Sequence, residues 1–395
     1  MTQDMNQTPS ANRTRIAFFG MRNAGKSSVV NAVTGQAVSI VSPVAGTTTD
    51  PVRKAMEILP LGPVLIVDTP GLDDEGEVGA LRVSSALLEM ERADAAVLVV
   101  DAARGLCPQD RQLLERLDRA GVPHITVYNK CDLARPELSP GEIAVSAKTG
   151  ENIPALRDAL AGLVREAPGG GRRLLGDLLA PGDAVVLVTP IDESAPKGRM
   201  ILPQVQALRD ALDAGAYCAV TQPEALPAVL AAMPRPRLVV TDSQAFGVVA
   251  RIVPPEVPLT SFSILFARFK GVLGAAVRGA EALDGLRDGD RVLISEGCTH
   301  RRQCKDIGSV KLPAWIEGRT GKSLHFAFTS GGEFPRDVSD CALVVHCGGC
   351  MLGEREVLRR LSVAQACGVP FTNYGVLIAH IHGILRRSLS PFPEY

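Results

Sequence analysis

The segment Ile16-Ala-Phe-Phe-Gly-Met-Arg-Asn-Ala-Gly-Lys-Ser27 decides the fold of the first part of this 395-residue chain. Its first four residues predict a short buried strand, and Gly20 to Ser27 match the pattern G-x-x-x-x-G-K-[ST]. In such a loop the glycines let backbone N–H groups wrap phosphates, Lys26 reaches the β- and γ-phosphates, and the Ser27 hydroxyl binds Mg²⁺. The predicted helix from Ser28 to Thr34 directs its positive end at the same anion. The segment therefore predicts a phosphate-binding loop between a strand and a helix.

Two further motifs supply groups for the metal and the γ-phosphate. Gly46-Thr-Thr-Thr-Asp50 lies in a polar stretch suited to a mobile loop. Val64-Leu-Ile-Val67 predicts a buried strand that ends in Asp68-Thr-Pro-Gly71. The Asp68 carboxylate can hold Mg²⁺ through water, and the Gly71 N–H can meet the γ-phosphate.

The next two strands lead to a base-recognition motif. Ala95 to Val100 is a continuous apolar run, as a parallel sheet covered on both faces requires. His124 to Tyr128 then leads to Asn129-Lys130-Cys-Asp132. Asp132 can accept two hydrogen bonds from the N1–H and the 2-amino group of guanine, which adenine cannot supply, so we expect GTP as the nucleotide. Ser146-Ala147-Lys148 follows the last strand and is expected to close over the base.

This set of motifs resembles the TrmE/Era-like group of GTPases, over about 150 residues. The resemblance implies that Thr48 completes the Mg²⁺ shell. Leu72, directly after Gly71, cannot orient an attacking water as a glutamine does. Asn23 matches an asparagine that binds K⁺ in similar GTPases, where the cation supplies positive charge; the alternative is a turn-stabilising Asn.

The predicted residues of the nucleotide site have four roles. We expect catalysis from Lys26, Asn23 and Thr48, Mg²⁺ on Ser27, Thr48 and Asp68, and K⁺ on Asn23. The nucleotide-binding residues are predicted to be Gly20, Asn23, Ala24, Gly25, Lys26, Ser27, Ser28, Thr47, Thr48, Asp68, Gly71, Asn129, Lys130, Asp132, Ser146, Ala147 and Lys148.

A second region, after the flexible stretch Ala167-Pro-Gly-Gly-Gly171, alternates strand and helix patterns without a phosphate loop or a carboxylate pair. The alternation predicts a small parallel sheet. One predicted helix, Leu202 to Asp213, places Val205, Leu208 and Leu212 on one apolar face. A domain without chemistry of its own often serves assembly, so we expect this one to dimerise.

Three thiols and two imidazoles gather in two short segments of the third region. They are the first cysteine segment, Cys298-Thr-His300, and the second, His346-Cys347-Gly-Gly-Cys350. Each is predicted to follow a strand, at the sheet edge where an open α/β fold places a site. Three cysteines favour an iron–sulfur cluster with one exchangeable corner. Zn²⁺ on mixed Cys/His ligands and plain buried thiols are the alternatives.

With the motifs of the first region, the cysteine segments resemble the HydF family of [FeFe]-hydrogenase maturation GTPases over the whole chain. The resemblance implies a [4Fe–4S] cluster on Cys298, Cys347 and Cys350. His300 or His346 is then the fourth ligand or lies next to the cluster. It also implies a homodimer that receives a transient di-iron precursor, built with two radical-SAM maturases, and passes it to apo-hydrogenase.

The predicted fold is α/β throughout. We expect a GTPase domain at 1–167, a linker at 168–182, a dimerisation domain at 183–262 and a cluster-binding domain at 263–395. The net charge of −1 and 4% aromatic residues disfavour nucleic-acid binding and hence a tRNA-modification or ribosome-assembly GTPase. No apolar run is long enough to span a membrane, and the polar start lacks a signal-peptide core, so we expect a cytoplasmic protein. A Zn-stabilised regulatory GTPase stays as the other alternative.

Overall fold

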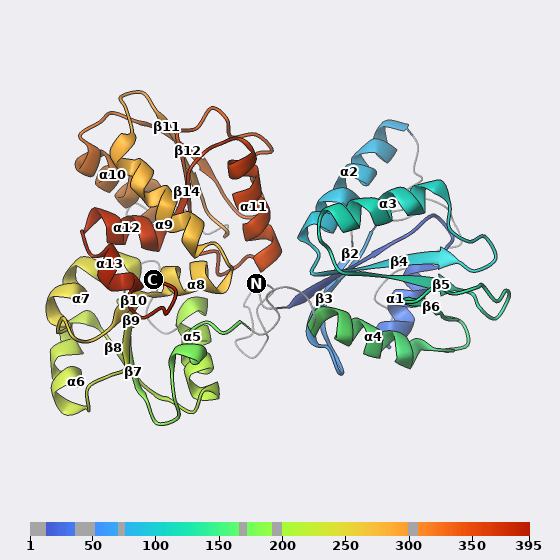
Figure 1. Ribbon diagram of the computed structural model, residues 1–395, viewed down its shortest axis with the longest axis horizontal. Coiled ribbons are helices and arrows are strands. Elements are labelled where there is room, and N and C mark those ends of the chain that lie inside the picture. The colour runs from blue at the N-terminus through green and yellow to red at the C-terminus, as the bar shows by residue number, and fades with distance from the viewer. Residues whose placement is uncertain (1–12, 36–51, 70–75, 166–171, 192–199, 299–306) are drawn as a thin grey trace. The chain divides into compact units, whose positions relative to one another are not determined.

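The computed structural model describes residues 13–35, 52–69, 76–165, 172–191, 200–298 and 307–395 (Figure 1). The chain divides into two compact units, Met1–Gly171 and Arg172–Tyr395. Within the described ranges, no helix is long and apolar enough to cross a membrane.

The first unit is built on a six-stranded sheet in the order β2-β3-β1-β4-β5-β6, in which only the β2–β3 pair is antiparallel. Its strands are β1 (Thr14–Phe19), β2 (Val52–Ile58), β3 (Gly62–Asp68), β4 (Ala95–Asp101), β5 (His124–Asn129) and β6 (Glu142–Ala144). Its helices are α1 (Lys26–Thr34), α2 (Gly76–Arg92), α3 (Pro108–Arg119) and α4 (Ile153–Arg165).

Helices cover both faces of this sheet because alternate side chains of each strand point to opposite faces. Ile16 and Phe18 of β1 belong to a core that includes residues of α1 and α4. Ala17 and Phe19 belong to a second core that includes residues of α2 and α3. The continuous apolar strands therefore form a buried parallel sheet, as the sequence predicts.

The second unit holds two four-stranded parallel sheets. The strands are β7 (Ala184–Val188), β8 (Tyr217–Thr221), β9 (Leu238–Thr241), β10 (Leu259–Ser261), β11 (Arg291–Ser295), β12 (His325–Thr329), β13 (Leu343–His346) and β14 (Phe371–Asn373). The helices are α5 (Leu202–Asp213), α6 (Leu226–Ala232), α7 (Phe246–Ile252), α8 (Phe262–Phe269), α9 (Leu273–Glu281), α10 (Leu312–Thr320), α11 (Glu354–Ala366), α12 (Tyr374–Ile381) and α13 (Leu385–Leu389).

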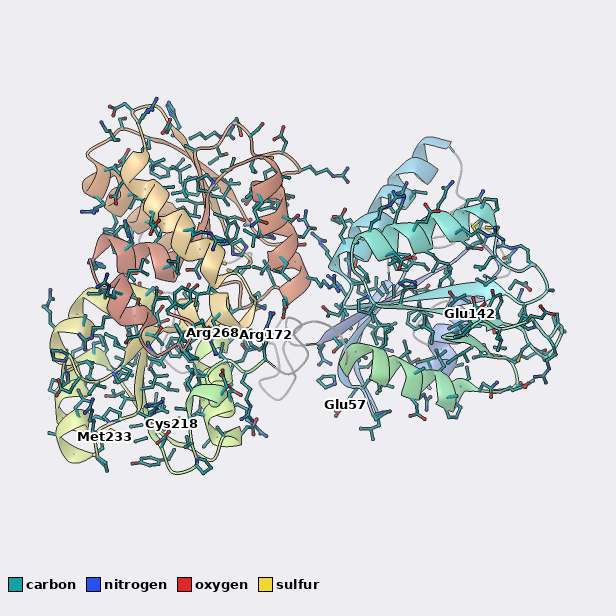
Figure 2. All side chains as sticks on the ribbon, viewed as in Figure 1. Glu57, Glu142, Arg172, Cys218, Met233 and Arg268 are labelled. Atoms are coloured by element: carbon teal, nitrogen blue, oxygen red, sulfur yellow. The ribbon has the colours of Figure 1, made fainter. Side chains whose placement is uncertain are left out.

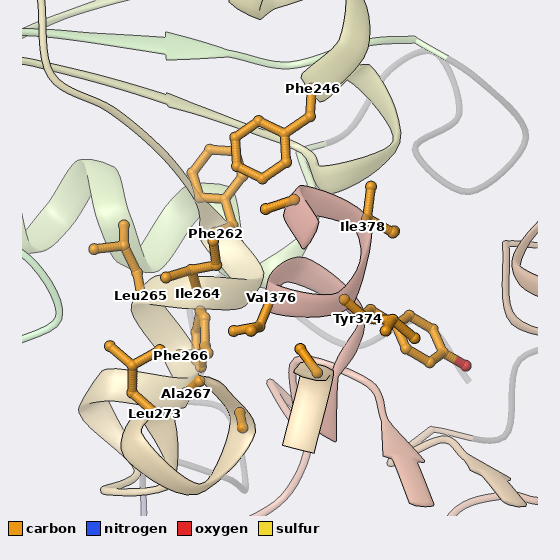
Figure 3. Packing of buried hydrophobic residues seen from close by; sticks show 14 of the residues in the cluster. Phe246, Phe262, Ile264, Leu265, Phe266, Ala267, Leu273, Tyr374, Val376 and Ile378 are labelled. Carbon is orange, nitrogen blue, oxygen red and sulfur yellow. The ribbon is translucent and has the colours of Figure 1, made fainter. Parts of the chain in front are cut away.

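One hydrophobic core joins the two sheets of this unit. Figure 3 shows where α8 and α12 meet, with Phe262 and Ile264 of α8 beside Val376 and Ile378 of α12. The start of the unit packs on the same core, since Leu175 is fully buried. The regions that the sequence predicts as a dimerisation domain and a cluster-binding domain therefore share one core.

Polar contacts link the two ends of the unit to helix α8. Arg268, labelled in Figure 2, donates to Asp177 at 2.5 and 3.0 Å and to Glu394 at 2.8 Å. Because Asp177 lies near the start of the unit and Glu394 at the end of the chain, one side chain of α8 links both ends.

The two sheets repeat one topology. Taken in chain order, the strands of each sheet lie in the spatial order second, first, third, fourth: β8-β7-β9-β10 and β12-β11-β13-β14. Each last strand runs directly into a helix whose first turn is capped by Ser261 or Asn373, which accept from the backbone N–H three residues later. The second unit therefore consists of two copies of one four-stranded fold, a first half built on β7–β10 and a second half on β11–β14.

The apolar face predicted for the helix of residues 202–213 is wrong for two of its three residues. Leu208 packs against the core, but Val205 is 42% and Leu212 54% exposed, and the fully buried residues are Gln204, Ala207 and Ala211. The helix packs closely through the small residues Ala207 and Ala211, which lie at helical spacing. Gln204 can be buried because its side chain accepts a hydrogen bond from the Ile201 N–H and donates one to Asp242.

Candidate functional site

The loop between β1 and α1 depends on two glycines. Gly20 has a φ of 145°, and a Cβ atom there would lie 2.2 Å from the Val99 carbonyl oxygen. Gly25 has a φ of 89°, and a Cβ atom there would lie 2.2 Å from Nδ2 of Asn129. Both positions exclude a side chain, so the loop passes close to its neighbours as the motif requires.

The positive groups of the loop gather at the start of α1. Lys26 Nζ donates to the carbonyl oxygens of Gly20 at 2.9 Å and Met21 at 3.1 Å, so the ammonium is folded back over the loop. Gly25, the N-cap of α1, has no side chain with which to cap the first turn. The N–H groups of that turn are therefore suited to an anion such as a phosphate.

Two predicted Mg²⁺ residues lie next to each other. The Ser27 hydroxyl donates to Asp68 Oδ2 at 2.7 Å, although the two residues come from α1 and the end of β3. Asp68 is only 3% exposed, and its Oδ1 finds no hydrogen-bond donor among the described residues. A buried carboxylate oxygen with no donor is costly, and a hydrated divalent cation would satisfy it. The pair fits Mg²⁺.

The base-recognition motif is assembled from three loops. Asn129 donates to the Ala24 carbonyl at 3.0 Å and accepts from the Ala147 N–H at 3.1 Å, so it joins the phosphate loop to the last loop of the sheet. Asp132 accepts from the Ser146 hydroxyl at 2.7 Å through Oδ1. That bond fixes the carboxylate and leaves it further acceptor sites for a purine edge.

Asn23, the predicted K⁺ residue, is an exposed residue in the left-handed region, at φ 61°. Its carbonyl oxygen accepts from Lys130 Nζ at 2.7 Å, and Lys130 also pairs with Asp101 at 2.6 Å. Asparagine tolerates this conformation well, so the geometry agrees with a tight turn as well as with a cation ligand. Thr47, Thr48, Gly71 and Leu72 lie outside the described residues.

The cysteine segments meet at one edge of the second half's sheet. Ser295, the last residue of β11, is in register with His346, the last residue of β13. Cys298 follows β11 by three residues, and Cys347 follows β13 directly, so the paired strands bring residues about 50 positions apart together. This confirms that Cys298 and Cys347 lie at the carboxyl ends of parallel strands, where open α/β sheets place sites.

Burial acts on two of the three thiols, Cys347 and Cys350, which are partly buried. Burial, and then the neighbouring Cys347 and Cys298, raise the pKa of Cys350 to about 12. Burial also raises the pKa of Cys347, against the effect of the Gly297 and Gly349 N–H groups, which donate to its sulfur at 3.1 and 3.3 Å. A metal would therefore have to displace thiol protons, after which both amides would stabilise the metal-bound sulfur.

A buried positive charge lies near these thiols. Lys270, 1% exposed, donates to the Leu352 carbonyl at 2.5 Å and lies over the rings of Phe266 and Phe269. Its ammonium is one of the groups that lower the pKa of Cys350 against the raising effect of burial. Buried positive charge favours a site that binds an anionic cluster of thiolates.

His346 is enclosed. It is 1% exposed and stacks on Phe371 with ring centroids 5.8 Å apart. Nδ1 lies 2.7 Å from the Cys347 carbonyl oxygen, and Nε2 lies 3.2 Å from a guanidinium nitrogen of Arg360. Burial and that guanidinium lower the pKa of His346 to about 3, so the imidazole is neutral at ordinary pH.

Two further observations concern the metal-ligating residues. In the described ranges, no three metal-ligating side chains are gathered as a formed metal site. His300 and Cys304 lie outside those ranges. The donor set of three thiols, two sulfur-directed amides and a buried ammonium nevertheless suits a cluster of iron and sulfur better than a hard cation.

Sequence reasoning missed Arg360, Lys270 and the Tyr374 hydroxyl, which donates to Glu296 at 3.1 Å beside the cysteines. Arg360 and Tyr374 lie in α11 and α12 and Lys270 directly follows α8, so all three come from outside the cysteine segments. A charged residue within a helical pattern usually indicates a solvated face, and only the three-dimensional packing shows that Arg360 is fully buried.

Comparison with known proteins decides the family. The model of the hydrogen maturase F dimerization domain matches residues 174–271, and that of the hydrogen maturase F tetramerization domain matches 274–391. The chain belongs to the hydrogen maturase F family. A third model, described as 50S ribosome-binding GTPase, matches residues 15–130, so the first unit of this family member is a GTPase domain.

Relatives outside the family share that domain. The tRNA modification GTPase MnmE of Dechloromonas aromatica is 39% identical over 153 residues, which is 37% of this chain and 34% of that protein. MnmE of Thiobacillus denitrificans is 38% identical over 148 residues, 37% of this chain and 32% of that protein. The chain thus spans about a third of the length of these relatives. Among solved structures, Era of Aquifex aeolicus bound to GDP·AlF₄⁻ is similar at 23% identity with a TM-score of 0.36, over 53% of this chain and 93% of that one.

Proposed function

We propose that this chain hydrolyses GTP to GDP and phosphate in its first unit and binds a [4Fe–4S] cluster in its second. We further propose that it carries a di-iron precursor to apo-[FeFe]-hydrogenase during assembly of that enzyme's active centre. The observation that carries the proposal is that Cys298 follows β11 while Cys347 and Cys350 follow the paired strand β13, at one sheet edge of the half matched by a hydrogen maturase F model.

For GTP hydrolysis, the described residues supply positioning and charge. Lys26 leaves the loop carbonyls for the β- and γ-phosphates, and Ser27 and Asp68 bind hydrated Mg²⁺. Asp132 selects guanine. Thr48 is assigned to the Mg²⁺ shell and Asn23 to a K⁺ ion, which supplies charge near the phosphates that Leu72 cannot.

For the cluster, Cys298, Cys347 and Cys350 are the three protein ligands. When bound, the cluster supplies one iron with an exchangeable position at which the precursor can attach. The chain's own residues position the thiols, partly bury Cys347 and Cys350, and place buried cations near them. His300 is assigned to the fourth position or its surroundings.

The architecture that we propose keeps a GTPase domain at 1–167, a connection at 168–182, a dimerisation domain at 183–262 and a cluster domain at 263–395. The printed descriptions of the two matching models, dimerization and tetramerization, support a homo-oligomer. The partners are apo-hydrogenase and the radical-SAM maturases of the same pathway, in the cytoplasm, without nucleic acid or membrane.

A maturation assay tests the proposal. Apo-hydrogenase is incubated with both radical-SAM maturases and either the anaerobically reconstituted wild-type chain, Cys347→Ser, or Cys218→Ser. Cys218 is a matched control because it is a half-buried cysteine of the first half of the unit. We expect hydrogenase activity with the wild type and Cys218→Ser only. Equal activation without this chain would refute the carrier role, and zinc in place of iron in the purified protein would refute the cluster.

A further inference from the structure

Arg360 of α11 is the largest fully buried side chain of the described residues, and it lies between the two cysteine segments. Its guanidinium donates to Glu356 at 2.8 Å, to the Ser295 hydroxyl at 3.1 Å and to the Gly331 carbonyl at 2.6 Å. It also lies 3.2 Å from His346 Nε2 and over the ring of Phe334. A buried arginine is costly unless it is bonded on several sides, as it is here.

These contacts lead to both cysteine segments by backbone hydrogen bonds. The Gly331 N–H donates to the Cys298 carbonyl at 3.2 Å, while the Gly331 carbonyl accepts from Arg360. On the other side, the Cys347 N–H donates to the Ser295 carbonyl at 2.9 Å. The Arg360 guanidinium thus bonds Ser295 and Gly331 directly. These two residues in turn hold Cys347 and Cys298 by backbone hydrogen bonds.

The ring nitrogens of His346 are both engaged in this arrangement. A guanidinium can only donate, so Nε2 accepts from Arg360; a carbonyl can only accept, so Nδ1 donates to Cys347. The only lone pair of the neutral ring is therefore directed at Arg360. An imidazole in this state has no nitrogen available for iron.

The first half of the unit shows that the fold does not itself require the network. There, Val188 ends β7 where Ser295 ends β11, and Thr241 ends β9 where His346 ends β13. The positions equivalent to Cys298, Cys347 and Cys350 carry Ile191, Asp242 and Ala245. The polar network and the cysteines therefore occur together in the second half.

We propose that Arg360 is a positioning residue that sets the spacing of the two cysteine segments, through Gly331 to Cys298 and through His346 to Cys347. His346 then supports the Cys347 turn and is not a cluster ligand. The inference rests on the proposed cluster function and deepens it, because it assigns the preparation of the ligand geometry to a residue that binds no metal.

The first test needs no metal. In the apo-protein, alkylation of each cysteine by iodoacetamide is followed by mass spectrometry. We expect Arg360→Gln to raise the alkylation rates of Cys298 and Cys347 several-fold. His346→Ala should raise the rate of Cys347 alone, because the link from Arg360 to Gly331 persists. Arg359→Gln is the matched control, since Arg359 is the neighbouring residue of the same helix and donates to both carboxylate oxygens of the same Glu356.

The second test uses the reconstituted cluster. Loss of a residue that supports metal ligands typically lowers metal affinity about 10- to 100-fold, so Arg360→Gln should bind iron that much more weakly than Arg359→Gln. Pulsed EPR should find the same ¹⁴N couplings in wild type and His346→Ala.

Four outcomes distinguish the role of Arg360 from the proposed cluster function. Loss of a strong imidazole ¹⁴N coupling in His346→Ala would overturn the inference, and so would equal alkylation rates in Arg360→Gln and Arg359→Gln. If Arg360→Gln does not fold, as near-UV circular dichroism would show, the His346→Ala rates decide. A wild type that binds no iron would refute the proposed function, while the alkylation test of Arg360 would still stand.

Discussion

Replacing Asp68 by asparagine should have opposite effects on the stability of the first unit and on its use of Mg²⁺. Asp68 is 3% exposed, with Oδ2 bonded to Ser27 and no donor for Oδ1 among the described residues. The asparagine keeps the acceptor for Ser27 and removes a buried charge. The apo-protein should therefore become more stable, although its function is lost.

The magnitude follows from the charge of the carboxylate. An unsatisfied buried group costs about 1–3 kcal/mol and more when it is charged, and we take about 1–2 kcal/mol as the charge-dependent part that the neutral amide of Asp68→Asn recovers. For a domain of 150–250 residues, each kcal/mol shifts the melting temperature by about 2–4 °C, so an increase of about 2–8 °C is expected in EDTA. Loss of a water-mediated contact should weaken Mg²⁺ binding about 10- to 100-fold, which corresponds to about 1.4–2.7 kcal/mol.

The assay is calorimetry of the wild type, Asp68→Asn and Asp110→Asn in EDTA, with Mg²⁺ titrations of the GDP complex. Asp110 is a matched control because it is equally buried and also has an unsatisfied Oδ1, yet its Oδ2 accepts from Arg104 and from the Cys107 N–H at the start of α3. Asp110→Asn should lower stability and leave Mg²⁺ binding unchanged. An Asp68→Asn protein that melts below wild type in EDTA, or that keeps wild-type Mg²⁺ affinity, would refute the reasoning.

Three other predictions concern the two sites. Asp132→Asn should shift nucleotide preference from guanine toward xanthine, measured by competition binding; an unchanged preference would remove Asp132 from base recognition. Hydrolysis should be faster in K⁺ than in Na⁺, and Asn23→Ala should abolish the difference; equal wild-type rates in both salts would count against the K⁺ site. Serine at Cys298, Cys347 or Cys350 should remove the iron signal while GTP hydrolysis persists, since the sites lie in separate units; full cluster retention in a Cys347→Ser, Cys350→Ser protein would exclude the assignment.

The motifs of the first unit could be predicted from the sequence, because each of them is a contiguous stretch. A strand, a glycine loop and a helix that follow one another leave few ways to arrange Gly20 to Ser27. Buried apolar runs also predicted a parallel sheet, whereas its strand order and the antiparallel strand β2 come from the structure. The carboxylate of Asp68 and the amide of Asn129 then reach the loop because parallel strands end at one edge.

The helix Leu202–Asp213 shows where local pattern fails. Periodicity identified the helix with its observed bounds, but of the predicted face only Leu208 packs against the core, because burial depends on which surface can approach the sheet closely. Ala207 and Ala211 allow that approach, while the larger Val205 and Leu212 remain exposed. Side-chain size at the contact decides the outcome, and it is known only when the partner surface is known.

For the second unit, the sequence by itself determined which residues could bind a metal and at the ends of which strands they lie. Only the tertiary structure decided that the unit is one fold used twice, that a single core joins both copies, and that His346 is enclosed. The physical reason is the range of the interactions. A Cys-x-x-Cys turn is local, whereas the partners of His346, Arg360 and Gly331 come from segments that meet only after the sheet has formed, and nothing in their own sequence neighbourhoods records that meeting.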